Sequence, residues 1–298
     1  MRFQVWLAEI RAPFLLLSAV LVCVGSSLAA YHGFFNPAHF ALATVGLILI
    51  HISVNTLNEY FDYKTGVDLR TVKTPFSGGS GVLPAGLLQP SAVLKTALAS
   101  FAGAAVVGGY FLFTVGLVLL PILLLGAVLT LFYTQFFARI MLGEIAAGLG
   151  MGPLPVLGAY LVHTGFYTAE AFLLSVPPGI LVFNLLFLNE FPDVEADRAG
   201  GKRNLVMALG YRRAAILYSA LTFSVYVYTV LCVLYGWFPM FLLLSLLTLP
   251  FAFKAASTAF KGPEKIEAFI PGLKANVMVV LATQGLFAAG YLIAALTG

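Results

Sequence analysis

The chain has 298 residues, of which 61% are hydrophobic and only 9% are charged, with a formal net charge of +4. Soluble domains carry roughly 25% charged residues, so this composition excludes a soluble globular domain, a disordered chain and a nucleic-acid-binding module. The two cysteines lie inside apolar runs, which excludes a disulfide scaffold. The chain is therefore expected to be an integral membrane protein, with no nucleic-acid partner.

Nine apolar runs follow one another along the chain. They are 12–31, 40–57, 92–113, 115–137, 142–162, 169–189, 212–235, 238–256 and 275–296. A membrane-spanning helix needs about 20 apolar residues, so we expect an all-α membrane protein of nine transmembrane helices in a single domain, 1–298. The first run is too long for a signal peptide and is not followed by a clear cleavage site.

Lysine and arginine concentrate at alternate ends of these runs. They occur before the first run and after the second, fourth, sixth and eighth, whereas the loops after the first, third, fifth and seventh runs have none. Because cytoplasmic loops are enriched in Lys and Arg, this pattern predicts a cytoplasmic N-terminus and a C-terminus on the other side. Eleven of the twelve acidic residues fall on the same side, with Glu170 as the exception. Acids contribute little to orientation, so their placement needs another cause.

Two acidic motifs, at 55–68 and 189–203, mark the ends of the second and sixth runs. Both contain the spacing Asn-x-x-x-Asp, which places the two side chains on one face of a helix. The residues with this spacing are Asn58 and Asp62 in the first motif, and Asn189, Asp193 and Asp197 in the second. Pro192 is expected to kink or end the second helix.

Like charges at this spacing repel, and their desolvation near a membrane is costly unless a cation lies between them. Mg²⁺ is usually held by one or two carboxylates together with substrate phosphates. Basic residues beside the motifs are candidates to bind those phosphates: Lys64, Arg70, Lys73, Lys202 and Arg203. The glycine-rich segment 77–81 can add backbone N–H groups. A solvated rim of charges is the alternative, and it explains a single motif better than two matched ones.

The two motifs are four runs apart, so both enter their loops at the same membrane face. This arrangement predicts two pseudo-repeated four-helix units that share two Mg²⁺ ions bridged by a diphosphate.

At these residues the sequence resembles the UbiA superfamily of intramembrane prenyltransferases, over nearly the whole chain. The segments that carry the resemblance are "RAPF" at 11–14, "NEYFDYKTGVD" at 58–68, "LGEIAAGLGMGPLPVLGAY" at 142–160 and "NEFPDVEADRAGGKRNLVMALG" at 189–210. The first motif is most similar to the 1,4-dihydroxy-2-naphthoate prenyltransferases of menaquinone synthesis and their UBIAD-type relatives, and "NEFPD" is similar to archaeal members. Gly66 stands where many 4-hydroxybenzoate-type members carry an acid, and the nearest acid is Asp68.

The resemblance implies helices around a central cavity, with Mg²⁺ and an isoprenyl diphosphate under the two loops on the cytoplasmic side of the cell membrane. The metal ligands would be Asn58, Asp62, Asn189, Asp193 and Asp197, with Asp62 and Asp193 central to catalysis. Ionisation of the allylic C–O bond would give a carbocation, which an electron-rich aromatic acceptor attacks to form a new bond. Segments 103–109 and 146–155, rich in small residues, are candidates to enclose the prenyl tail.

Four further residues are candidates, each with a plainer alternative. Tyr133 could shelter the carbocation through its ring, or simply pack. Glu144 could orient or deprotonate the acceptor, or act as a helix-capping charge. Arg11 could bind the diphosphate or the acceptor's acidic group, or anchor the N-terminus at the membrane. Asp68 is expected to bind substrate, and direct metal ligation by it is left open.

Two other functions compete with this hypothesis. A secondary transporter is favoured by Pro177-Pro178 inside a span, but the acids lie at one membrane face rather than at the midplane. A non-aromatic acceptor such as geranylgeranylglyceryl phosphate is the second alternative, and no residue excludes it. No obligate protein partner is expected.

Overall fold

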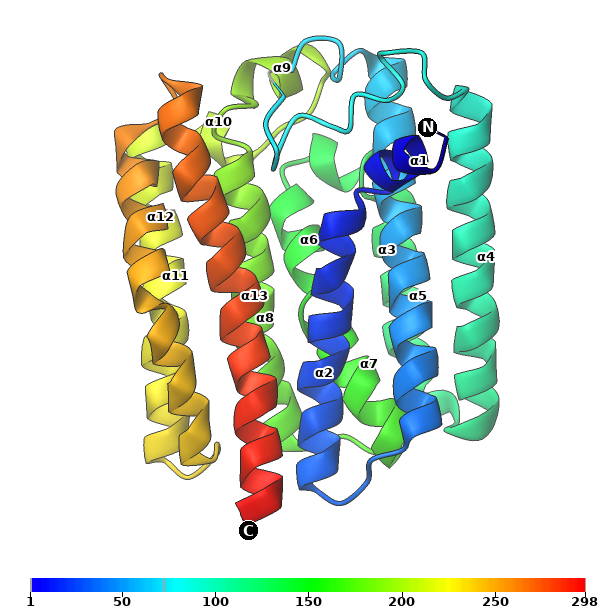
Figure 1. Ribbon diagram of the computed structural model, residues 1–298, viewed down its shortest axis with the longest axis vertical. Coiled ribbons are helices and arrows are strands. Elements are labelled where there is room, and N and C mark those ends of the chain that lie inside the picture. Colours follow the sequence, from blue (N-terminus) through cyan, green and yellow to red (C-terminus); the bar gives the residue numbers. More distant parts are fainter. Residues whose placement is uncertain (1, 72, 298) are drawn as a thin grey trace.

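The computed structural model describes residues 2–71 and 73–297, and every regular element within those ranges is a helix. Figure 1 shows a bundle of long helices that run side by side, with short helices and loops gathered at one end. The long helices are α2 (Leu16–Tyr31), α3 (Pro37–Thr65), α4 (Pro90–Thr114), α5 (Leu120–Phe132), α7 (Pro153–Thr164), α8 (Ala169–Asn189), α11 (Tyr211–Leu234), α12 (Leu249–Lys261) and α13 (Ile266–Thr297). The short helices are α1 (Arg2–Glu9), α6 (Gly143–Gly150), α9 (Val194–Ala199) and α10 (Leu205–Leu209), with 3₁₀ segments at Ala12–Leu15, Leu117–Leu119, Phe137–Arg139 and Met240–Thr248. The all-α prediction is confirmed.

Eight helical segments in the described ranges are long and apolar enough to cross a membrane. They are Ala12–Tyr31, Pro37–Thr65, Pro90–Thr114, Gly143–Thr164, Ala169–Asn189, Tyr211–Leu234, Met240–Lys261 and Ile266–Thr297. The predicted run 115–137 corresponds to a shorter apolar helix, Leu117–Phe132. At 1.5 Å per residue it is about 24 Å long, less than the ~30 Å of a hydrocarbon core. The N- and C-termini lie at opposite ends of the bundle, as an odd number of crossings requires (Figure 1). The count of nine stays a prediction.

Local signals set the boundaries of α3, the helix of the first motif. The Asn36 side chain accepts hydrogen bonds from the N–H groups of Ala38 and His39, which caps the first turn. The helix ends where Gly66 adopts the left-handed conformation with φ 78°. The α8 helix ends at Asn189, so Asp193 and Asp197 do not continue on it and belong to the turn and to α9. We call the end of the bundle where α3 and α8 terminate the motif end.

The apolar run 142–162 is broken into α6 and α7. At the break, Gly152 lies so close to the backbone of Gly148 and Gly179 that a Cβ would not fit. Such small residues let the broken helix pack directly on α8. Within α8, Pro177 cannot donate to the carbonyl of Leu173, and the hydroxyl of Tyr228 donates to that carbonyl instead, at 2.9 Å.

A polar network joins four helices at the end of the bundle opposite the motif end. One oxygen of Glu170 lies 2.9 Å from His32 Nε2, and the other accepts a hydrogen bond from the Tyr291 hydroxyl at 2.8 Å. His32 Nδ1 is 2.9 Å from the hydroxyl of Tyr160. The network therefore connects α8 with the end of α2, α7 and α13, and it explains why one acid lies apart from the others.

We expect Glu170→Ala to lower the thermal stability of the detergent-solubilised protein, by about 1–3 kcal/mol, because His32 and Tyr291 would lose a shared half-buried partner. Thermal unfolding measures the loss. Glu264→Ala, which removes an exposed acid near α13, is the matched control. Equal stability of the two variants would show that the network does not hold the helices together.

Candidate active site

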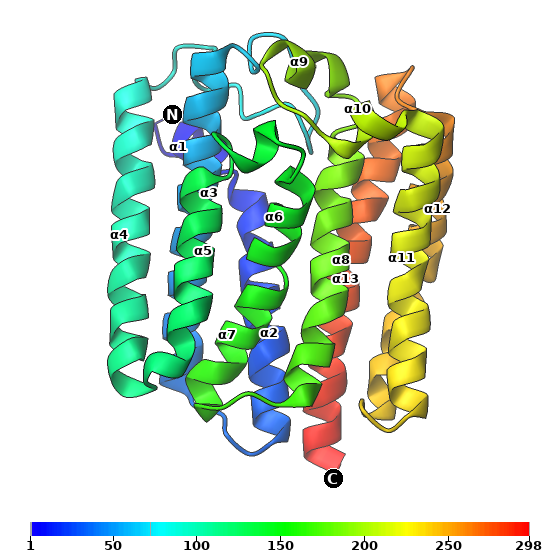
Figure 2. The ribbon, with the colours of Figure 1, turned by 180° about the vertical axis from the view of Figure 1, so that it is seen from behind.

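The two acidic motifs meet at the motif end. Lys202 of the second motif donates a hydrogen bond from Nζ to Asp62 Oδ2 at 2.6 Å, and the same nitrogen lies 3.8 Å from Asp197 Oδ1. Val67 packs so closely on Gly200 that a Cβ at position 200 would not fit. In Figure 2 the loop after α3 and the segment carrying α9 lie together at the top of the bundle. The structure thus brings the two motifs into direct contact.

Hydrogen bonds orient the asparagines of both motifs through their amide nitrogens. Asn58 Nδ2 donates to Thr134 Oγ1 at 3.1 Å, and Asn189 Nδ2 donates to the carbonyl of Phe76 at 3.2 Å. With its nitrogen engaged, Asn189 keeps its oxygen available, and that oxygen is buried. Phe76 belongs to the loop between α3 and α4, so this bond also ties the two motif loops together.

Buried oxygen atoms from both motifs have no hydrogen-bond donor within residues 2–71 and 73–297. In the motifs' predicted site residues they are Asp62 Oδ1, Asp68 Oδ2, Asn189 Oδ1 and Asp193 Oδ1. Buried polar atoms are nearly always paired, so a group of unpaired oxygens has the character of a cation site. Carboxylate and amide oxygens are the ligands that Mg²⁺ prefers. The residues of the motifs therefore fit a divalent cation.

The electrostatics of the motifs agree with this fit. Burial and the carboxylates of Glu59 and Asp62 raise the pKa of Asp68 to about 7, and burial and Asp197 raise the pKa of Asp193 to about 7. Within the described part of the chain, no three His, Cys, Asp or Glu side chains converge as ligands of one ion. The donors are thus spread over two loops, and an ion bound there needs substrate phosphates to complete its coordination.

Asp197 has partners for both oxygens, unlike the other predicted ligands. Its Oδ2 accepts a hydrogen bond from Asn204 Nδ2 at 3.1 Å, and its Oδ1 faces Lys202. Asn204 caps α10 by accepting from the N–H of Met207. Asp197 therefore connects the second motif with the start of α10.

Two lysines predicted to bind phosphate lie at the end of α3 and in the loop that follows it. Lys64 is exposed, and its Nζ lies 4.7 Å from the ring centroid of Tyr60. The side chain of Lys73 is also exposed and packs along Gly81, which leaves no space for a Cβ there. In this structure neither ammonium contacts a motif carboxylate through a described ion pair.

The predicted arginines have different surroundings. Arg70 and Arg203 are exposed, and the backbone N–H of Arg203 donates to the carbonyl of Ala138. Arg11 instead binds Glu59, with its Nε and Nη2 at 2.8 and 2.5 Å from Glu59 Oε1. Arg11 has a left-handed backbone with φ 53°, an unusual conformation for a residue with a side chain.

A cluster of three polar side chains, Glu144, Glu190 and Tyr133, lies beside the motifs. Glu144, in the first turn of α6, is fully buried and accepts a hydrogen bond from the N–H of Leu205 at 2.6 Å. Glu190 is buried at the end of α8, where burial and Glu144 raise its pKa well above the ordinary range. The half-buried Tyr133 follows α5, close enough for the charges of Glu190 and Glu144 to act on its hydroxyl. Glu144 thus ties α6 to the segment that follows the second motif.

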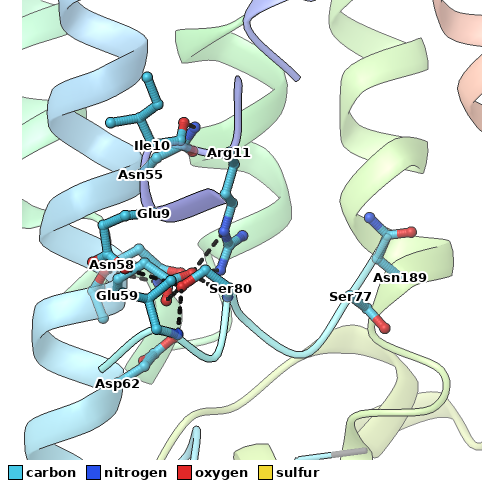
Figure 3. Close-up of polar contacts among 12 residues, drawn as sticks. Glu9, Ile10, Arg11, Asn55, Asn58, Glu59, Asp62, Ser77, Ser80 and Asn189 are labelled. Atoms are coloured by element: carbon cyan, nitrogen blue, oxygen red, sulfur yellow. Dashed lines mark hydrogen bonds and ion pairs between the residues drawn. The ribbon is translucent and has the colours of Figure 1, made fainter. Parts of the chain in front are cut away.

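Sequence reasoning missed Glu59, Ser80 and Glu9, which Figure 3 places beside Arg11. Glu59 lies between Asn58 and the next turn of α3, off the face that carries the Asn-x-x-x-Asp pair, and it is fully buried. Ser80 donates hydrogen bonds to it from both N–H and Oγ, at 2.8 and 2.7 Å. The signal available in the sequence was a further acid inside the first motif, next to Asn58.

Comparison with known proteins identifies the family. Residues 18–296 match the UbiA prenyltransferase family. A 1,4-dihydroxy-2-naphthoate octaprenyltransferase of Bacillus subtilis is 31% identical over 228 residues, covering 74% of this chain and 70% of that protein. The enzyme with the same name from Escherichia coli is 28% identical over 302 residues, covering 97% and 95%. UbiA prenyltransferase domain-containing protein 1 of Gallus gallus is 27% identical over 238 residues, covering 78% and 69%.

Solved structures share the fold. A UbiA homologue from Aeropyrum pernix K1 superimposes with a TM-score of 0.72 at 18% identity, covering 94% of this chain and 98% of that one. A digeranylgeranylglyceryl phosphate synthase gives 0.66 at 16% identity, covering 98% and 99%. A UbiA homologue from Archaeoglobus fulgidus bound to GPP and Mg²⁺ gives 0.61 at 12% identity, covering 98% of both chains. The chain therefore belongs to the UbiA prenyltransferase family, in the naphthoate prenyltransferase and UBIAD-type branch, and is a multi-pass integral membrane enzyme that transfers prenyl groups.

Proposed function

We propose that this enzyme transfers an isoprenyl group from an isoprenyl diphosphate to an aromatic acceptor similar to 1,4-dihydroxy-2-naphthoate, in a Mg²⁺-dependent reaction. The observation that carries the proposal is the set of buried, unpaired oxygens that both motifs present at the motif end. Two relatives are named naphthoate octaprenyltransferases, and an A. fulgidus neighbour was solved with GPP and Mg²⁺.

The residues of both motifs would share the work at the diphosphate. The metal ions, two in our proposal, would be held by Asn58, Asp62, Asn189, Asp193 and Asp197. Bound Mg²⁺ neutralises the diphosphate and stabilises it as a leaving group. Lys202, now bound to Asp62, would release that carboxylate and bind a phosphate oxygen instead. Asp68 would help to orient the substrate. Four exposed basic side chains would also bind phosphate oxygens: Lys64, Arg70, Lys73 and Arg203.

An apolar cavity of about 350 Å³ supports binding of the prenyl tail. It lies between α2, α3, α4, α5 and α7, and Thr130 provides the polar side chain among its described lining residues. Thr130 is in the last turn of α5, four residues before Thr134, the residue that receives the hydrogen bond from Asn58. The predicted tail segments contribute to the lining through Ala104, Ala105, Val107, Gly108, Gly109, Gly150, Leu154 and Pro155. The lining of the cavity therefore includes a residue four positions from the one that contacts the first motif.

The acceptor would meet the allylic carbon beside Tyr133. When the allylic C–O bond breaks, the electron pair leaves with the diphosphate, and the face of an aromatic ring stabilises the remaining carbocation. The acceptor ring attacks this carbon through one of its own electron pairs and then releases a ring proton. Glu144 Oε2 is buried and has no hydrogen-bond partner among the described residues, so we assign it as the proton acceptor.

The sidedness of the site is part of the proposal. Lys and Arg residues cluster at the loops of the motif end, which supports placing that end in the cytoplasm and the enzyme in the cell membrane.

An assay of the purified protein in detergent tests the function. The protein would be incubated with Mg²⁺, a radiolabelled prenyl diphosphate and a panel of acceptors that includes 1,4-dihydroxy-2-naphthoate and geranylgeranylglyceryl phosphate. We expect a labelled naphthoate product that disappears when Mg²⁺ is chelated. If the product forms with the glycerol-phosphate lipid and not with the naphthoate, the acceptor is that lipid and the aromatic assignment is wrong. If no acceptor gives a Mg²⁺-dependent product, the proposal is rejected.

Gly126→Phe tests the tail cavity separately. Gly126 lines the cavity, and a Cβ there meets no atom within 4 Å, so the larger side chain fills the cavity without a backbone clash. We expect kcat/KM for a long-chain donor to fall at least about tenfold, while a dimethylallyl donor reacts as before. Gly285→Phe on α13, where a Cβ is equally unhindered, is the control outside the cavity. Equal losses with long and short donors would place the tail elsewhere.

A further inference from the structure

Four polar residues from three segments form a cluster beside the first motif, and the chemistry proposed above uses none of them. Glu9 ends α1, Arg11 follows it, Glu59 belongs to α3, and Ser80 lies in the loop between α3 and α4 (Figure 3). Neither Glu9 nor Glu59 has exposed surface. Both carboxyl groups contact the hydroxyl of Ser80, so the cluster raises the question of which of them is ionised.

The hydrogen bonds of the cluster assign the negative charge to Glu59. Its Oε1 accepts from Nε and Nη2 of Arg11 and from the N–H of Ser80, and its Oε2 lies 2.7 Å from Ser80 Oγ. The guanidinium of Arg11 therefore balances the carboxylate of Glu59. A second buried carboxylate would have no positive partner in the cluster, and an unpaired buried charge is costly.

The proton count assigns a neutral state to Glu9. Glu9 Oε2 lies 3.0 Å from the same Ser80 Oγ that contacts Glu59, and a serine hydroxyl has one proton to donate. If that proton serves Glu59, the contact with Glu9 is a hydrogen bond when Glu9 itself carries a proton and donates it to Ser80 Oγ. Burial, the main cause, and the charge of Glu59 raise the pKa of Glu9 to about 7, against the opposing effects of Ser80 and Arg11.

Ser80 belongs to a loop that reaches both motifs. We call residues 73–82 the strap. A Cβ at Gly79 would lie 2.7 Å from Asp68 Oδ1, and its φ of +72° favours glycine, so the strap backbone passes directly over that carboxylate. In the first half of the strap, the carbonyl of Phe76 accepts the hydrogen bond from Asn189. The position of Ser80 therefore determines how closely the strap covers the oxygens of the two motifs.

We propose that Glu9, Ser80 and Glu59 form a latch, in which neutral Glu9 donates to Ser80 and Ser80 donates to Glu59, and that this latch positions the strap and Arg11 over the diphosphate of the prenyl donor. The latch rests on the proposed function, and Glu9 and Glu59 act in it as positioning residues.

The charged groups that face Glu9 are Glu59 from α3 and Arg11 from its own segment. When the pH rises through the pKa of Glu9, its neutral form is lost, two carboxylates compete for one proton, and the latch opens. Affinity for the donor therefore falls as the pH rises, and kcat changes little.

Glu9→Gln separates this latch from a merely structural role, because the amide N–H₂ donates to Ser80 without titrating. At saturating Mg²⁺ and acceptor, we expect the KM of the wild type for the donor to increase about tenfold from below to above neutral pH. The KM of Glu9→Gln should stay low across that range, and Glu9→Ala should show a high KM throughout. Glu267→Gln, an exposed acid on α13, should titrate like the wild type. A wild-type KM that does not change with pH, or a Glu9→Gln profile that still follows the wild type, would overturn the latch.

Hydrogen exchange of the strap provides a readout that does not depend on catalysis. Peptides covering 73–89 should exchange faster in Ser80→Ala and Glu9→Ala than in the wild type at the same acidic pH. At alkaline pH the wild type should exchange faster than Glu9→Gln. If no donor is turned over but these differences appear, the proposed function fails and the latch stands. Identical exchange in all variants would reject the latch whatever the activity.

Discussion

Asp62→Asn and Asp193→Asn are each expected to lower prenyl transfer by at least about a thousandfold while the protein stays folded. Each of these carboxylates keeps a buried Oδ1 without a hydrogen-bond partner among the described residues, which is the character of a metal ligand rather than of a packing residue. The neutral amide preserves the size of the side chain and removes the charge that a divalent cation needs. Labelled product formed at saturating Mg²⁺ and donor measures the effect.

Glu195→Gln is the matched control for these two variants. Glu195 lies in α9 between Asp193 and Asp197, but its side chain is 84% exposed and pairs with Arg198 at the surface. Its activity and its thermal unfolding should both equal those of the wild type. Retention of most activity in either aspartate variant would reject the assignment of the metal site to the two motifs.

Lys202→Met should change the affinities for the two ligands of the site in opposite directions. The ammonium of Lys202 is bound to Asp62 at 2.6 Å, and both side chains are largely buried. Without the ammonium of Lys202, Mg²⁺ no longer competes with it for Asp62, so Mg²⁺ alone should bind more tightly. The diphosphate loses a buried positive partner, so a non-reacting prenyl thiolodiphosphate should bind about a hundredfold more weakly. Calorimetric titration of each ligand measures both changes.

Two further variants make the Lys202 result specific. Lys202→Arg keeps the charge and should retain most of the diphosphate affinity, whereas Lys265→Met removes an exposed lysine outside the motifs and should affect neither ligand. If Lys202→Met weakens Mg²⁺ and the diphosphate analogue together, Lys202 supports the fold of the second motif and does not exchange between carboxylate and phosphate.

Patterns along the chain predict much of the fold and the contact between the motifs. Apolar runs of membrane length identify the helices because the hydrocarbon core sets their length and composition. Matched Asn-x-x-x-Asp spacing at two helix ends predicts that both motifs reach the same end of the bundle. In the first motif Asn58 and Asp62 share a face of α3, whereas α8 ends at Asn189, so the helical face predicted for Asp193 and Asp197 is wrong. The contact between Lys202 and Asp62 agrees with that reasoning.

Other parts depend on tertiary contacts that no local pattern encodes. The break at Gly152 lies inside a continuous apolar run and depends on how close Gly179 of another helix comes. The pairing of Arg11 with Glu59 joins residues 48 positions apart, and a positive charge near a membrane face is equally expected from orientation rules. Lys64 lies over the ring of Tyr60. A long, flexible side chain can reach several partners, so the sequence does not predict which one it contacts.

The polar network around Glu170 has a consequence for how the helices can move. Its hydrogen bonds join α2, α7, α8 and α13 at the end of the bundle farthest from the two motifs. The helices are therefore held together at that end, and we expect any separation between them to be largest at the motif end. Bulky amphiphilic substrates would then enter and leave at one membrane face, while the helix contacts in the opposite leaflet stay closed.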